Sequence, residues 1–368
     1  MKSASIPYFR LDHLARHYSA EFNRIQQEVL LSGQYFDENE IRGFEEALAA
    51  RCQREHAVSV ACCTDALYFS LLGIGIRPGN LLALPSVSFI ATLTPLLRAG
   101  AVPVFIDIDP GTGIMDLNHL ETIMQKYPLK AVVFADLYGN MVHPGDIKVL
   151  SERYGIPFVS DAAQSLGCVR EGVPAGKTGQ VACFSFDPTK VIHAFGSGGA
   201  VLTDDKALAA RIRRMRYHGK EGQDYLEHGY NSRINTFQAR LLRFQLEKLD
   251  EITEDRGRTA RRLAGALSDR EGIRLLNHGN DIHQYHKFVV LAEEREKLRE
   301  QLAEAGIQVM IHYPLPLSEY ALLHDRTFVN EGIVHAKTFC DQVLSFPLHT
   351  FMDEEDVIAL CETLTKIA

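Results

Sequence analysis

The chain has 368 residues, 46% of them hydrophobic, and a formal net charge of -8, which allows a large core in two domains and excludes a basic nucleic-acid-binding surface. Its seven cysteines form no C-x-x-C pair, which excludes a zinc site and favours reduced thiols over a disulfide framework. No apolar run approaches the ~20 residues of a membrane span and no signal peptide opens the chain, so we expect a cytoplasmic protein without a membrane or metal partner.

Seven short apolar segments, each rich in Val, Ile or Phe, alternate with amphipathic stretches between about residues 57 and 245. They cover residues 56–62, 80–85, 102–109, 130–136, 156–161, 182–186 and 200–205. Continuous apolar strands that alternate with helices predict a mostly parallel sheet covered on both faces. A helix over residues 66–72 is apolar all round and is predicted to be buried, and one long helix is predicted from Gln238 to about residue 267.

The pattern changes after about residue 270. A strand is predicted at 286–292, a charged helix over 293–306 closed by Gly306, a second strand at 307–314, and a last helix that starts near Asp353. These elements indicate a small α+β domain. We therefore predict an α/β protein with a large domain over residues 1–250, including an N-terminal helical segment, and a small domain over residues 251–368.

Two residues lie where open α/β sheets bind ligands, beyond the carboxyl ends of strands. Asp161 ends the segment 156–161, and a carboxylate there needs a partner such as a protonated ring nitrogen; a helix cap for the residues that follow is the alternative. Lys190 follows the segment 182–186 and precedes a glycine cluster. A partly desolvated lysine can form a Schiff base, although a lone lysine is more often a solvated surface charge.

Three further residues fit a flat, phosphorylated ligand. Thr64 can cap the helix after the segment 56–62, where free backbone N–H groups bind phosphate, and Ser185 can add a hydroxyl group; plain capping is the alternative. Phe89 follows the segment 80–85, and an aromatic side chain at a strand exit can stack on a planar ring, although core packing is commoner for a single Phe.

In this order along the chain, these features resemble the DegT/DnrJ/EryC1/StrS sugar aminotransferases, which depend on pyridoxal 5'-phosphate (PLP). The resemblance begins at about Ile6 and runs to the C-terminus. It rests on CTDALYFSLLGIGIRPG, PSVSFIATLTPLLRAGAVPVFIDID, SDAAQSLG, FSFDPTK with GSGGAVLTDD, GYNSRINTFQARLLRFQLEKLD, and IHYPLPL with LSFPLH. It implies PLP fold type I, as in aspartate aminotransferase, with a mostly parallel seven-stranded sheet in the large domain.

The resemblance also implies roles around the cofactor. Lys190 would form the Schiff base and move the proton, Asp161 would pair with the pyridine nitrogen, and Gln164 would lie near the ring hydroxyl. Phe89 would stack on the ring. The residues expected around the phosphate are Thr64, Asp65 and Ser185.

Other implied roles concern a second subunit and the substrate. Asn231, in the segment GYNSR, would reach the phosphate of the neighbouring subunit, with Arg233 nearby, which makes the protein a homodimer with shared active sites. His312 and Tyr313 would face the substrate. Four positions depart from the family pattern, and three of them lie where the sugar would be recognised. These positions are Cys63, in place of a glycine, and Asp136, Asp187 and Ser318.

The implied reaction has two halves. L-glutamate gives its amino group to PLP, leaving pyridoxamine 5'-phosphate, which then aminates a nucleotide-linked keto-sugar. The motifs favour C-3 of a dTDP- or UDP-linked 3-keto sugar, and C-4 amination is the main alternative. A dehydratase of this fold has His in place of the lysine, so Lys190 argues against it; a non-catalytic sensor of the same fold is a further alternative. A nicotinamide-binding protein is excluded because no G-x-G-x-x-G follows the first strand. The pathway, such as lipopolysaccharide O-antigen synthesis, stays open.

Overall fold

A seven-stranded sheet forms the centre of the computed structural model, which describes residues 5–268, 270–276 and 284–367. Its strand order is β1-β9-β8-β5-β4-β2-β3. The strands are β1 (His56–Val60), β2 (Leu81–Pro85), β3 (Val102–Ile106), β4 (Ala131–Ala135), β5 (Phe158–Asp161), β8 (Val181–Ser185) and β9 (Gly199–Thr203). The pairs from β8 through β5, β4 and β2 to β3 are parallel, whereas β9 is antiparallel to both its neighbours. All seven predicted strands and the mostly parallel sheet are thereby confirmed.

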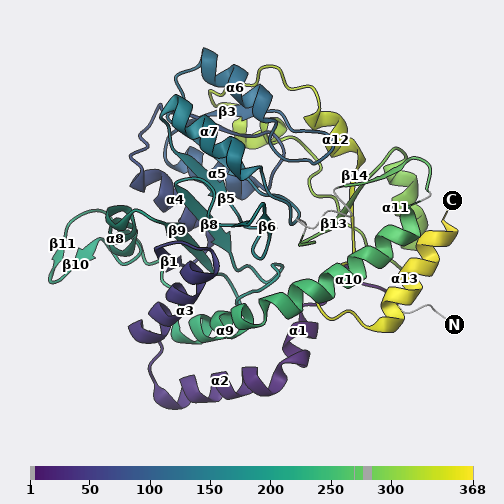
Figure 1. The fold of residues 1–368 in the computed structure, drawn as a ribbon, viewed down its shortest axis with the longest axis horizontal. Helices are drawn as coiled ribbons and strands as arrows, with labels where there is room; N and C mark the ends of the chain where they lie inside the picture. Colours follow the sequence, from purple (N-terminus) through teal and green to yellow (C-terminus); the bar gives the residue numbers. More distant parts are fainter. Residues whose placement is uncertain (1–4, 269, 277–283, 368) are drawn as a thin grey trace.

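Helices cover both faces of this sheet (Figure 1). The strands are apolar on both sides, and successive residues of β8 show why. Phe184 packs in a cluster with α3 and α9, whereas its neighbour Cys183 packs in a second cluster with α4 and α8. The covering helices are α4 (Cys63–Gly73), α5 (Ile90–Arg98) and α8 (Lys206–Met215) on one face, and α3 (Glu38–Arg51), α6 (Leu117–Lys126), α7 (Pro144–Tyr154) and α9 (Thr236–Glu247) on the other. As predicted, the helix that contains residues 66–72 is buried over most of its length.

Smaller elements surround this core. Two N-terminal helices run below the sheet in Figure 1, and a short hairpin projects from the molecule beside α8. These elements are α1 (Asp12–His17), α2 (Ser19–Ser32), the hairpin β10 (Lys220–Glu221) with β11 (Asp224–Tyr225), and a second hairpin of β6 (Val169–Arg170) with β7 (Val173–Pro174).

The long helix predicted from Gln238 is two helices, which corrects the prediction. The helix α9 ends at Glu247, and α10 (Leu249–Leu267) begins after Lys248. The amide of Lys248 is shared between the carbonyls of Phe244 and Gln245, a three-centre bond typical of a helix end. In Figure 1, α10 runs from the large sheet to the C-terminal elements.

A three-stranded antiparallel sheet lies in the C-terminal part. Its order is β12-β13-β14, and it packs on α10, α11 and α13. The elements are β12 (Ile273–Leu275), β13 (Phe288–Ala292), α11 (Arg295–Glu304), the 3-10 turns η1 (Leu317–Glu319) and η2 (Ala321–Leu323), α12 (Ala336–Gln342), β14 (Val343–Phe346) and α13 (Glu354–Lys366). Gly306 has a φ of +81° after the last turn of α11, and Asp353 precedes α13, as predicted.

The strand predicted at 307–314 is wrong. In place of a ladder, this segment makes two isolated bridges, from Ile307 to Ile6 and from Met310 to Ser345. Residue Ser345 belongs to β14, which pairs with β13 and was not predicted. The division into two domains at residue 250 stays a prediction, and α10 crosses that position. Among the described residues, no helix combines the length and apolar character that a membrane span requires.

Candidate active site

A cavity of about 420 Å³ opens at the carboxyl ends of the parallel strands. Eight of the eleven predicted site residues line it. They are Thr64, Phe89, Asp161, Gln164, Ser185, Lys190, His312 and Tyr313. The other three, Asp65, Asn231 and Arg233, do not line it.

Asp161 is the last residue of β5 and is 7% exposed. Its carboxylate accepts hydrogen bonds from the Thr92 hydroxyl (2.6 Å) and the Ala163 amide (3.2 Å). No Lys, Arg or His within the described part of the chain forms an ion pair with it, and burial raises its pKa. The site therefore holds a buried carboxylate that a cation in the cavity would stabilise.

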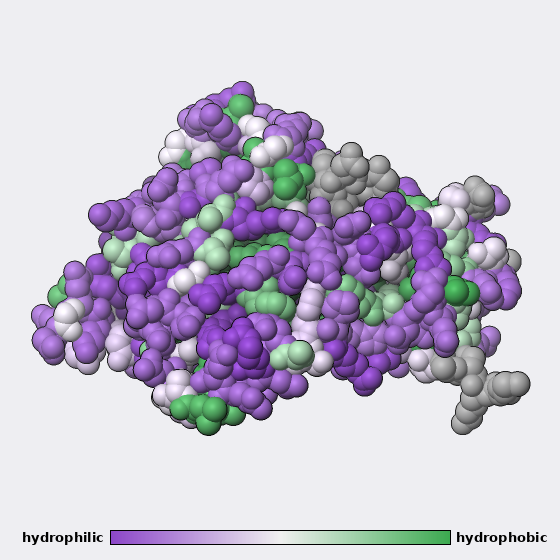
Figure 2. All heavy atoms as spheres, turned by 60° about the horizontal axis from the view of Figure 1, so that its bottom comes forward, coloured by the Kyte–Doolittle hydropathy of each residue, from purple (hydrophilic) through white to green (hydrophobic). Residues whose placement is uncertain are grey.

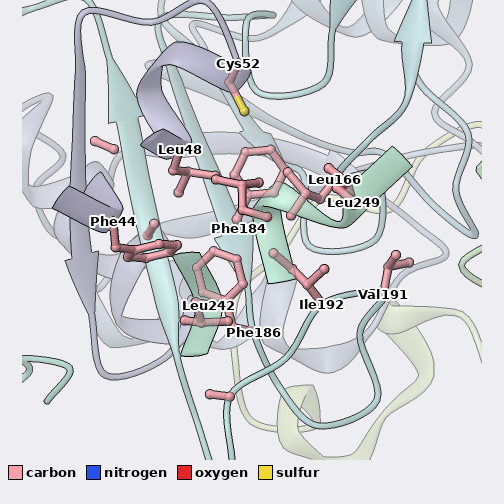
Figure 3. Packing of buried hydrophobic residues seen from close by; sticks show 14 of the residues in the cluster. Phe44, Leu48, Cys52, Leu166, Phe184, Phe186, Val191, Ile192, Leu242 and Leu249 are labelled. Atoms are coloured by element: carbon pink, nitrogen blue, oxygen red, sulfur yellow. The ribbon is translucent and has the colours of Figure 1, made fainter. Parts of the chain in front are cut away.

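Lys190 lies in the loop after β8, and the core fixes the residues around it. The hydrophobic side chains of Phe184, Phe186, Val191 and Ile192 pack into one cluster (Figure 3). The Lys190 amide donates to the Asp187 carbonyl (2.9 Å). Its side chain lines the cavity, where burial lowers the pKa of the amine, as expected for a Schiff-base lysine.

The start of α4 differs from the prediction. The helix begins at Cys63, and the cap is the Cys62 sulfur, which accepts from the Asp65 amide (3.4 Å), so Thr64 does not cap the helix. Thr64 instead lies in the first turn, with its side chain at the cavity. Ser185, at the end of β8, also reaches the cavity. Two residues with hydroxyl groups and a helix N-terminus thus line the same cavity, which suits a phosphate group.

Asp65, Asn231 and Arg233 lie outside the cavity of their own chain. The Asp65 carboxylate accepts from the Ser232 hydroxyl (2.7 Å) and from Arg98 (3.2 Å). Asn231 is exposed. Arg233 forms an ion pair with Glu38 (3.2 Å) and lies 3.8 Å above the Tyr217 ring. None of these three residues lines the cavity of its own chain.

A further part of the cavity wall is formed by residues that follow strands of the large sheet and by residues of the C-terminal part. Phe89 precedes α5 and is 52% exposed, and its ring centroid lies 5.9 Å from that of Tyr313. The Gln164 side chain donates to the Tyr313 hydroxyl (3.0 Å) and accepts from the Tyr138 amide (2.9 Å). His312 is hydrogen-bonded to Ser345 of β14 (2.9 Å). This network places the residues of the C-terminal part against the end of the large sheet.

The cavity also contains residues that no sequence motif indicated as ligands. Phe9, from the N-terminal segment, and Lys287, from the C-terminal part, both line it. Thr92 of α5 donates a hydrogen bond to Asp161. Asp136, noted only as a departure from the family pattern, is buried, and its burial raises its pKa to about 7. The described residues contain no cluster of three metal-ligating side chains.

These residues fit PLP. A buried carboxylate without a cation, a desolvated lysine, an exposed aromatic ring and a helix N-terminus with two hydroxyl groups all face one cavity. They offer partners for a pyridine nitrogen, an aldehyde, a ring face and a phosphate.

Comparison with known proteins agrees with this geometry. Residues 17–365 match the model of the DegT/DnrJ/EryC1/StrS aminotransferase family. The chain is 30% identical to a Geobacillus stearothermophilus protein named pleiotropic regulatory protein (98% of both chains). It is 32% identical to the UDP-2-acetamido-2-deoxy-3-oxo-D-glucuronate aminotransferase of Pseudomonas aeruginosa (92% of this chain, 94% of the relative). The crystal structure of S. venezuelae DesV in complex with a ketimine intermediate superposes with a TM-score of 0.94 at 32% identity (99% of this chain, 98% of that one). The fold, the cavity and the family match together show that the chain is a PLP-dependent enzyme that belongs to the DegT/DnrJ/EryC1/StrS aminotransferase family.

Proposed function

We propose that this enzyme transfers the amino group of L-glutamate to a nucleotide-linked keto-sugar, at C-3 of a dTDP- or UDP-linked 3-keto sugar. The observation that carries the proposal is that Lys190 and Asp161 line one cavity, as transamination requires. The P. aeruginosa relative, named for a UDP-linked 3-oxo sugar, supports the C-3 position.

Two residues carry the chemistry in this proposal. Bound PLP supplies an electron sink for the charge that develops on the substrate carbon. The Asp161 carboxylate holds a proton on the pyridine nitrogen, which relieves the cost of its own burial. Lys190 holds the cofactor between turnovers and moves the proton at the substrate carbon with its Nζ atom. Its lowered pKa suits this role, because a general base works best when its pKa is near the working pH.

The remaining cavity residues position the two reactants. Thr64 and Ser185 bind the phosphate together with the start of α4, and Phe89 stacks on the ring. Gln164 reaches the ring hydroxyl from its position beside Tyr313. His312 and Tyr313 face the sugar.

A homodimer with shared active sites is part of the proposal. Asn231 and Arg233 lie outside the cavity of their own chain, so a second subunit is the way for them to reach a ligand. Asn231 then contacts the partner's phosphate, Arg233 lies beside it, and Asp65 supports the same region through Ser232. The face of the molecule shown in Figure 2 is mostly hydrophilic, with a few hydrophobic places. Large exposed apolar side chains cluster from the end of α2 to the start of α3, which supports a subunit contact there; they are Leu30, Leu31, Tyr35 and Phe36.

Two alternatives remain. A C-4 keto-sugar aminotransferase needs the same cofactor residues and differs in how the sugar is held. The name of the G. stearothermophilus relative favours a regulatory protein of the same fold. Such a protein has no need for a desolvated lysine and a buried carboxylate in one cavity, and this chain has both.

The test is the visible absorbance of the purified protein before and after addition of L-glutamate. A yellow band that glutamate bleaches is the expected result, and incubation with 3-keto and 4-keto nucleotide sugars then identifies the aminated carbon by NMR. A band that glutamate leaves unchanged would mean another amino donor. If no band forms with added PLP, the regulatory function becomes the better explanation.

A further inference from the structure

A second lysine lies in the active-site cavity. Lys287 directly precedes β13, is 7% exposed, and lines both the main cavity and a small adjoining one. Its amide donates to the Tyr138 carbonyl (3.1 Å), which anchors the backbone at the large sheet. The Nζ atom lies 5.7 Å from the centroid of the Tyr8 ring and 5.6 Å from that of the Phe9 ring. The side chain is therefore held among aromatic rings at the cavity wall.

The ammonium group of Lys287 lacks an anionic partner. No carboxylate within the described residues lies within 4.0 Å of it, and Lys190 and Arg256 are the charged groups that oppose its protonation. Asp187 is the acidic group that favours its protonation, but the two form no ion pair, and the Oδ1 atom of Asp187 accepts from the amide (3.0 Å) and hydroxyl (2.6 Å) of Thr189. Burial, with this repulsion, lowers the pKa of Lys287 to about 7.

A buried cation without a partner is costly, and a protein that keeps one in a ligand cavity has a use for it there. An amino acid that donates its nitrogen at Lys190 must bring a carboxylate into the same cavity. Arg256 cannot bind that carboxylate, because its guanidinium group donates to the backbone carbonyls of Tyr285, His286 and Leu348. Among the described residues of this chain that line the cavity, Lys287 is therefore the cation that remains available to bind the carboxylate.

We propose that Lys287 binds a carboxylate group of the substrate and thereby selects acidic substrates. The inference rests on the proposed aminotransferase function and adds a specificity residue to it. Two sources bring this chemistry into the cavity. One is the amino donor, such as L-glutamate or its product 2-oxoglutarate, and the other is a sugar acid linked to the nucleotide.

The experiment compares the PLP-loaded wild type with Lys287→Met, which keeps the length but removes the charge, and Lys287→Arg, which keeps the charge. Lys148→Met is the matched control, because Lys148 is an exposed lysine of α7. Dissociation constants are measured by titration with 2-oxoglutarate, L-glutamate, UDP-glucuronate and UDP-glucose. Loss of a charge-assisted hydrogen bond should weaken carboxylate binding about 10- to 100-fold in Lys287→Met, with partial recovery in Lys287→Arg.

The set of ligands whose binding weakens distinguishes the two sources of the carboxylate. Weaker binding of glutamate and 2-oxoglutarate identifies the donor carboxylate. Weaker binding of UDP-glucuronate, with UDP-glucose unchanged, identifies a sugar acid. Unchanged constants for all four ligands, or an equal loss for UDP-glucose and UDP-glucuronate, would overturn the proposal. The Tm of Lys287→Met should equal or exceed that of the wild type, since an unpaired buried charge is removed. Failure of the proposed function is seen separately, as a wild-type PLP band that no amino donor bleaches, or as a pyridoxamine form that no keto-sugar converts back.

Discussion

The backbone amide of Asp136 donates a 3.1 Å hydrogen bond to the backbone carbonyl of Asp161, so two buried carboxylates stand at the ends of adjacent parallel strands. The Asp161 carboxylate accepts a hydrogen bond from the Thr92 hydroxyl, whereas the Asp136 carboxylate accepts from the Val142 amide (2.9 Å) and the Ser165 hydroxyl (3.2 Å). Burial raises the pKa of both, and repulsion from the Asp161 charge raises the pKa of Asp136 further. The charge on Asp161 therefore affects the protonation of Asp136.

Asp136→Asn should change how stability depends on pH. The pKa of Asp136 is raised from 3.8 to about 7 in the folded protein, so the folded state binds the extra proton between these values. Its contribution to stability is complete below about pH 4 and is lost as the pH rises through 7. An asparagine side chain does not titrate, so the Asp136→Asn variant does not lose this stability as the pH rises. Between pH 4 and pH 8 its free energy of unfolding should therefore increase by roughly 1–3 kcal/mol relative to that of the wild type. Urea denaturation of the cofactor-free protein at several pH values measures it.

The matched control for that experiment is Asp341→Asn, which changes an exposed carboxylate of α12 whose ion-pair partner is a lysine, Lys337. Its stability relative to the wild type should stay constant over the same pH range. Parallel pH profiles for wild type and Asp136→Asn would show that Asp136 does not carry the raised pKa.

Lys190→Ala should lower turnover at least about 1000-fold, because the residue is proposed both to hold PLP and to move the proton. Lys287 remains in the cavity of this variant, so residual absorbance of a lysine-bound cofactor should disappear in the double variant Lys190→Ala/Lys287→Met. Steady-state rates and visible spectra measure both effects. A Lys190→Ala enzyme with the wild-type rate would remove Lys190 from the mechanism.

Asp161→Asn should lower kcat by about 100-fold or more while PLP still binds, because an amide cannot hold the proton on the pyridine nitrogen. Thr92→Val is the control, since it removes the 2.6 Å hydrogen bond to the carboxylate and keeps the charge. Its effect on kcat should be much smaller. If both variants lose the same activity, the hydrogen bond rather than the charge of Asp161 is what matters.

Homodimers of the Lys190→Ala chain and homodimers of the Asn231→Ala chain should each have little or no activity. Mixed dimers that contain one chain of each kind should regain one intact active site. Random assembly of equal amounts gives about a quarter of the wild-type activity. Activity of purified subunits, mixed after separate expression and exchange, measures the recovery. Mixtures no more active than their parents would place Asn231 outside the neighbouring site.

Gly199→Ala should disturb the start of α4. A Cβ atom on Gly199 would lie 2.4 Å from the carbonyl carbon of Cys62 and 2.6 Å from the amide of Cys63, so the turn must move. We expect a loss of about 2 kcal/mol or more in the free energy of unfolding, with weaker PLP binding. Gly265→Ala in α10 meets no atom within 4 Å and should instead stabilise the protein by roughly 0.5–1 kcal/mol. Equal stabilities for both variants would show that the turn adapts.

The central sheet could be predicted from the sequence because each of its strands is a short apolar run bounded by turn residues, and both faces are buried. The segment 307–314 carries the same local pattern, yet Ile307 meets Ile6 and Met310 meets Ser345. Such partners are remote in the chain, and no local rule reveals which strand takes the place beside β13.

The candidate site divides in the same way. Asp161 and Lys190 follow predicted strands, so their placement at the end of the sheet could be anticipated. The cap at Cys62 could not, because sulfur is not among the usual capping atoms. Lys287 stands in a strand-like run, HKFVVLA, where a lysine ordinarily marks a solvated side, and only the packing of Tyr8 and Phe9 around it reveals a buried cation.

The bridge between Ile6 and Ile307 has a consequence for the order of folding. The Ile6 amide donates to Gly306 (2.9 Å) and the Ile6 carbonyl accepts from Gln308 (3.0 Å), close to where Phe9 forms part of the cavity wall. The segment around Ile6 therefore finds its partners only when the C-terminal part of the chain has folded. These partners are remote in sequence, which makes the closure of this side of the cavity a slow, non-local step of folding.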